Sequence, residues 1–70
     1  MSIEVLFTRG NGIYVVRRGD VYYLLNLTDD GAPISSKYVD SFLKFSYFDE
    51  VESVEETVFE EIKKRIDAVV

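Results

Sequence analysis

The sequence predicts a small α+β fold: an antiparallel β-meander of three or four strands with a C-terminal amphipathic helix packed on one face. Two observations predict it. Three short runs of β-branched and aromatic residues are separated by turn signals, and in the last segment apolar residues recur at helical spacing. The length of 70 residues allows one small domain, which we take to cover 1–70.

The meander is predicted over residues 1–28. Its strand-forming runs cover 3–8, 13–17 and 21–27. Gly10-Asn11-Gly12 separates the first two runs and Arg18-Gly19-Asp20 the last two, and both contain residues that favour tight turns.

Loops of three residues in both hairpins would assign every strand residue to one of two faces. The first face would then carry Ile3, Val5, Phe7, Ile13, Val15, Val21, Tyr23, Leu25 and Leu27. The second would carry a tyrosine-rich patch made of Leu6, Tyr14, Val16, Tyr22 and Leu24. In this register Glu4 lies opposite Arg18, and a slip of one residue in either turn would exchange the faces of a strand.

The C-terminal helix is predicted over residues 54–69. Ser53 and Glu56 have the spacing of a capping box, with the hydroxyl at the cap and the carboxylate three residues later. The apolar positions that follow at three- and four-residue spacing are Val54, Val58, Phe59, Ile62, Ile66 and Val69. We expect this stripe to lie across the first face of the sheet.

Residues 34–48 fit two structures. Tyr38, Val39, Phe42 and Leu43 have helical spacing, whereas apolar and polar residues alternate from Leu43 onward as in a strand. We favour a short helical turn that leads into a fourth strand within 42–48. If this segment folds over the tyrosine-rich patch, the patch is part of the core; otherwise it is an exposed interface.

The composition excludes much chemistry. The chain has no His and no Cys, so it contains neither an imidazole base nor a thiolate for catalysis or for a zinc site. Its carboxylates fall mostly in turns or on the polar side of the helix, where water solvates them. We therefore expect no enzymatic activity, no catalytic residues, no cofactor and no metal ligand. Apolar runs of only a few residues cannot span a membrane, and the simplest expectation is a cytoplasmic protein.

Negative charge is concentrated near the C-terminus. The net charge is −5, and seven acidic residues lie within residues 49–61 with no basic residue among them. Favourable placement along the helix dipole explains part of this pattern, but not the acids that precede the predicted cap. We expect a partner-binding acidic surface that consists of Asp49, Glu50, Glu52, Glu55, Glu56 and Glu60.

Three functions follow from these surfaces. The preferred one is a regulator or inhibitor whose acidic surface docks on a basic partner protein, for example one that handles nucleic acid. The first alternative is a homodimer or larger assembly formed through the tyrosine-rich patch. The second is weak binding of single-stranded nucleic acid through Tyr14, Tyr22 and nearby arginines, which the acidic balance of the chain disfavours.

Overall fold

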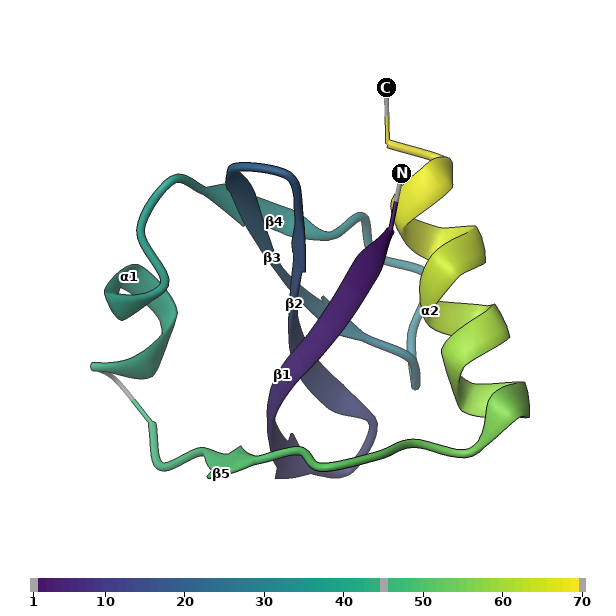
Figure 1. The fold of residues 1–70 in the computed structure, drawn as a ribbon, viewed down its shortest axis with the longest axis horizontal. Helices are drawn as coiled ribbons and strands as arrows, with labels where there is room; N and C mark the ends of the chain where they lie inside the picture. The colour runs from purple at the N-terminus through teal and green to yellow at the C-terminus, as the bar shows by residue number, and fades with distance from the viewer. Residues whose placement is uncertain (1, 45, 70) are drawn as a thin grey trace.

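A five-stranded antiparallel sheet forms the centre of the protein, and a helix lies against one side of it (Figure 1). The computed structural model describes residues 2–44 and 46–69. The elements are β1 (Ile3–Gly10), β2 (Ile13–Arg18), β3 (Val21–Asn26), β4 (Ile34–Ser36), α1 (Asp40–Leu43), β5 (Asp49–Glu50) and α2 (Glu56–Asp67). The strand order is β4-β3-β2-β1-β5. The predicted α+β fold with an antiparallel sheet and a C-terminal helix is confirmed.

Both hairpins close with two-residue loops. In the first hairpin Gly10 pairs with Ile13, so Asn11 and Gly12 form the loop, with φ of 55° and 78°. Positive φ at both central positions is the requirement of a type I′ turn, which Asn-Gly satisfies with little strain. In the second hairpin Arg18 pairs with Val21, and Gly19 takes φ 62° at the first loop position. The prediction of three-residue loops is therefore wrong.

The shorter second loop places β2 in a different register relative to β3 from the predicted one. Val16 lies opposite Tyr23 and Tyr14 opposite Leu25, so Tyr14 and Val16 share the face that was predicted for Ile13 and Val15. Along β1 the register shifts between Val5 and Phe7 because of a bulge, which pairs Phe7 with Val15 on the opposite face.

The register also changes a cross-strand ion pair. Glu4 lies opposite Arg17 and forms a salt bridge with it, instead of lying opposite Arg18 as the sequence suggested. The cause is the shift between Val5 and Phe7: Phe7 and Thr8 keep the predicted pairing with β2, and the shift moves Glu4 by one position, from Arg18 to Arg17.

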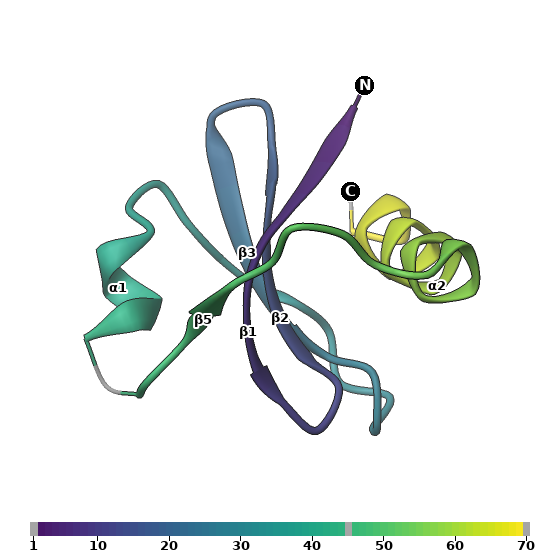
Figure 2. The ribbon, with the colours of Figure 1, turned by 60° about the horizontal axis from the view of Figure 1, so that its bottom comes forward.

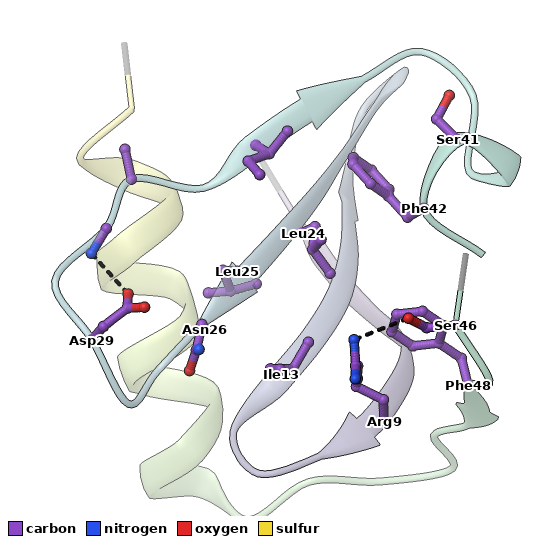
Figure 3. Close-up of a pocket in the computed structure, with 13 residues that line it drawn as sticks. Arg9, Ile13, Leu24, Leu25, Asn26, Asp29, Ser41, Phe42, Ser46 and Phe48 are labelled. Atoms are coloured by element: carbon purple, nitrogen blue, oxygen red, sulfur yellow. Dashed lines mark hydrogen bonds between the residues drawn. The ribbon is translucent and has the colours of Figure 1, made fainter. Parts of the chain in front are cut away.

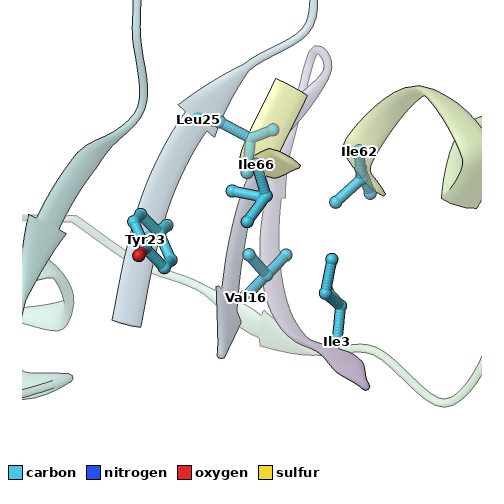
Figure 4. Packing of buried hydrophobic residues seen from close by; sticks show 6 residues of the cluster. All are labelled: Ile3, Val16, Tyr23, Leu25, Ile62 and Ile66. Atoms are coloured by element: carbon cyan, nitrogen blue, oxygen red, sulfur yellow. The ribbon is translucent and has the colours of Figure 1, made fainter. Parts of the chain in front are cut away.

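The main core lies between α2 and the face of the sheet that carries Tyr23 (Figure 4). Its buried members are Ile3, Val16, Tyr23, Leu25, Ile62 and Ile66. Ile62 and Ile66 of α2 and Val16 of β2 have no exposed surface. These two isoleucines are four residues apart, and therefore lie on one side of the helix.

The helix α2 is shorter than predicted and begins without the predicted capping box. Its N-cap is Glu55, which has extended backbone angles and makes no side-chain capping hydrogen bond. Upstream of it the chain follows the edge of the sheet, where the Val51 amide donates a hydrogen bond to the Leu6 carbonyl at 3.0 Å. This extended path carries Ser53 and Val54 outside the helix, so Ser53 is not at the cap position.

Residues 34–48 contain both a strand and a helical turn, but in the opposite order to the one expected. Ile34–Ser36 forms β4 and pairs with β3, and α1 follows it. The described residues within 42–48 form no strand, and Phe45 lies outside the described part of the chain. Phe42 is buried, and Phe42 and Phe48 lie beside Ile13 and Leu24 of the sheet, so the segment covers the second face through side-chain packing rather than strand pairing.

Two arginines connect α2 to the sheet. From β2, the Arg18 guanidinium donates to the carbonyl oxygens of Ile66 and Val69 at 3.2 and 3.4 Å and lies 3.6 Å from the Asp67 carboxylate. It also lies over the Tyr23 ring, 5.4 Å from the centroid. Arg18 therefore supplies positive charge and donors to the C-terminal end of α2, where the helix dipole favours a cation.

Arg65 makes the reciprocal connection from the helix. Its guanidinium donates to the carbonyl oxygens of Asn26, Leu27 and Asp29, the shortest distance being 2.7 Å to Asp29. Glu61, one turn earlier, accepts from Arg65 Nε at 3.2 Å. The helix thus holds the loop that follows β3 as well as the sheet itself.

We predict that Arg18→Gln lowers the free energy of unfolding by roughly 1–2 kcal/mol, because it removes the charge and several donors at the end of α2. Urea unfolding followed by far-UV circular dichroism measures the change. Arg17→Gln is the matched control, since Arg17 is the neighbouring strand arginine and its ion pair with Glu4 is exposed. Equal destabilisation by the two variants would contradict the role assigned to Arg18.

Candidate functional site

The acidic surface follows one edge of the sheet and continues onto α2. Asp49 and Glu50 form the edge strand β5, which pairs with Thr8 and Phe7 of β1. From β5 the chain runs on to the start of α2 (Figure 2). All six predicted residues of the acidic surface are exposed. The six residues lie within one stretch of the sequence, 49–60, and no residue of that stretch is buried.

The carboxylates of the acidic surface have no basic partner among residues 2–44 and 46–69. The ion pairs between described residues join Arg17 to Glu4, Arg18 to Asp67 and Arg65 to Glu61. Lys63 and Lys64 follow the acidic stretch and contribute to none of these pairs. The negative charge of this surface is consequently directed to solvent rather than neutralised within the fold.

The helix dipole accounts for only part of this charge. Glu56 is the one acidic residue in the first turn of α2, and Glu55 is its N-cap. Asp49, Glu50 and Glu52 lie before the helix, in β5 and the segment after it. Charged residues on an edge strand also discourage pairing with another sheet, which gives β5 a structural reason to be acidic.

The structure divides the tyrosine-rich patch between two faces and does not bring its five members together. Val16 is fully buried under α2, and Tyr14 packs against the same core. Leu24 lies on the opposite face in a pocket, and Leu6 and Tyr22 line a hollow beside Val39. The physical reason is the two-residue loop at Gly19, which reverses the expected orientation of β2 relative to β3.

The strand arginines do not form one basic surface with the tyrosines. Arg17 pairs with Glu4, and this hydrogen bond, together with the charge of the carboxylate, raises the pKa of Arg17 above its ordinary value. Arg18 is engaged at the end of α2, as described above. Arg9 lies at the other end of the meander, where its Nη1 donates to Ser46 Oγ at 3.0 Å.

A pocket of about 360 Å³ lies on the sheet face opposite the main core, and sequence reasoning missed it (Figure 3). Ile13 and Leu24 contribute from the sheet, and Phe42 and Phe48 contribute from the segment around α1. Arg9 lies at its edge. The sequence signal for this pocket was the phenylalanine content of 42–48, which includes Phe42 and Phe48. Such side chains pack against other apolar groups, but the sequence did not show which groups lay beneath them.

Comparisons with protein-family models, with curated proteins and with solved structures found no significant match to this chain. Within the described ranges no three acidic side chains lie close enough together to hold a metal ion. No helix of residues 2–44 and 46–69 is long and apolar enough to cross a membrane.

We predict that Val16→Ala lowers the free energy of unfolding by roughly 1.5–3 kcal/mol, because Val16 is fully buried between β2 and α2. The matched control is Leu6→Ala, which truncates a half-buried member of the same tyrosine-rich patch and should destabilise less. Urea unfolding midpoints of the two variants give the comparison. A Val16 variant as stable as the wild type would mean that β2 has the opposite orientation.

Proposed function

We propose that this protein is a non-enzymatic, cytoplasmic interaction module that regulates or inhibits a basic partner protein by docking its acidic surface on that partner. The observation that supports the proposal is the placement of six exposed carboxylates along β5, the following segment and the start of α2, with no basic partner among the described residues. A surface of one charge sign raises association rates with an oppositely charged partner and suppresses association with acidic proteins.

The fold supports this function by holding the charges in a fixed arrangement. Glu56 and Glu60 project from a helix that Ile62 and Ile66 anchor in the core. Asp49 and Glu50 belong to a strand that pairs with β1. A preorganised surface loses less conformational entropy on binding than a disordered acidic tail, so more of the electrostatic attraction contributes to affinity.

The partner that best fits this surface is a protein with a basic site for nucleic acid. Such a site already presents lysine and arginine side chains spaced along a phosphate backbone. A line of carboxylates can occupy the same groups and so exclude the nucleic acid. Single exposed ion pairs contribute only about 0.2–1 kcal/mol each, so an effective inhibitor of this kind has to engage several of them at once.

The two alternative functions have no comparable support. Self-association through the tyrosine-rich patch requires one continuous surface, and its members lie on two faces, with Val16 inside the core. Binding of single-stranded nucleic acid requires tyrosines beside available arginines, whereas Arg17 and Arg18 are both paired with carboxylates.

The proposal predicts that the triple variant Glu52→Lys, Glu55→Lys, Glu56→Lys weakens binding to the partner by roughly tenfold or more and flattens its dependence on salt. The partner is first captured from the native lysate with washes of rising salt, and affinities are then measured with the purified partner by calorimetry. A short DNA duplex added as competitor tests whether the same basic site binds nucleic acid.

The matched control is Asp20→Lys, Asp30→Lys, Asp40→Lys, which changes the net charge equally at exposed acids outside the acidic surface. Circular dichroism establishes that both triple variants retain the fold. Equal losses of affinity in the two triple variants would mean that binding depends only on the total charge of the protein. Unchanged affinity and salt slope in the first variant would refute docking through this surface.

A further inference from the structure

We propose that the pocket between the sheet and the α1 segment binds a small amphipathic anion, a molecule with an apolar body and a single carboxylate. The body lies over Ile13, Leu24 and Ile34, beside Phe42 and Phe48, and the carboxylate meets Arg9. This site is separate from the acidic surface, and it does not depend on the proposed function.

The pocket has apolar lining residues that suit the apolar body of the ligand. Its volume of about 360 Å³ lies at the lower end of the range typical of small-molecule sites. Leu24 and Ile13 form its floor, and the two phenylalanines approach from one side (Figure 3). Ile34 contributes from β4 and is 60% exposed, which is a large exposure for an isoleucine. An apolar ligand would remove this surface from water.

The charge of the ligand follows from Arg9. The other arginines, at positions 17, 18 and 65, each make an ion pair with a carboxylate. Arg9 makes none with any residue in 2–44 or 46–69, and the hydrogen bond it makes there goes to a neutral hydroxyl, that of Ser46, at 3.0 Å. An arginine fork that uses one donor in this way retains others for a carboxylate.

Ser46 adds a second donor at the same place. Its oxygen accepts from Arg9 Nη1, which orients the hydroxyl and leaves its own hydrogen to donate. The guanidinium and the hydroxyl therefore lie next to each other in the lining of the pocket, and in this proposal the carboxylate accepts from both.

The opposite side of the pocket disfavours a second anionic group. Asp29 lies there, well separated from Arg9 in Figure 3, and its Oδ1 accepts a hydrogen bond from the Gly31 amide at 2.9 Å. A ligand with a carboxylate at each end would place one of them beside this aspartate. The site thus fits a molecule with one anionic head and an apolar remainder.

Octanoate is the probe for this proposal, with octan-1-ol as the neutral and octylammonium as the cationic analogue. Titrations followed by amide NMR shifts of the full chain should show saturable octanoate binding, with the largest shifts at Ile13, Leu24, Ile34 and Ser46. Octanoate should bind more tightly than either analogue, because only it offers an acceptor of negative charge to Arg9.

Variants of the protein test separately the contact with the ligand's carboxylate and the contact with its apolar body. Arg9→Gln should weaken octanoate binding roughly tenfold and leave octanol unchanged, since a hydrogen bond to a charged group is lost. Arg17→Gln, the matched strand arginine outside the pocket, should leave octanoate binding unchanged. Ile34→Thr should weaken both ligands by similar factors, and its exposed position keeps the fold intact.

Several results would overturn the inference. They are the absence of saturable binding, equal affinity for the three probes, unchanged octanoate affinity in the Arg9 variant, or shifts confined to α2. The amide NMR signals of the pocket residues are also recorded at rising protein concentration without ligand. If these signals shift and sedimentation shows a dimer, the pocket holds a second copy of the chain and the assignment to a small anion is wrong.

Discussion

The packing of α2 against the sheet is the contact on which the rest of the structure depends. A meander of short strands is only marginally stable in water until one face is covered. Ile62 and Ile66 supply that cover by packing on Val16, Tyr23 and Leu25. Arg18 and Arg65 then fix the helix along its axis, because they satisfy backbone carbonyls at the end of α2 and in the loop after β3.

The packing of α2 on the sheet determines how the two proposed binding regions are arranged. Because one face of the sheet is filled by α2, the segment around α1 can pack only on the other, and it fills that face incompletely. Val15 and Phe42 are buried there, while the pocket beside them stays open. The acidic surface occupies a third region, the β5 edge and the start of α2, so the two proposed ligands would not compete for the same residues.

The candidate sites differ in how far they could be predicted from the sequence. Prediction of the acidic surface requires only that its residues be exposed. Charged residues on an edge strand or a helix are exposed in almost any arrangement of these elements. The six members of the acidic surface are exposed. The tyrosine-rich patch depended on register, and a difference of one residue in the loop at Gly19 was enough to bury Val16 and separate Leu24 from Tyr14. The pocket is formed by residues up to thirty-nine positions apart, from Arg9 to Phe48, and no local pattern reports such proximity.

The sequence by itself determined the elements: three strands, two turns rich in glycine, a C-terminal helix with an apolar stripe, and an excess of acids beside that helix. These properties are local, since alternation, helical spacing and turn chemistry act over a few residues. Only the tertiary structure decided which side of β2 faces the helix, where 34–48 adds its strand, and which arginine lacks a carboxylate partner among the described residues. Those outcomes depend on exact loop length and on contacts between distant segments, where the free-energy differences come from packing rather than from propensity.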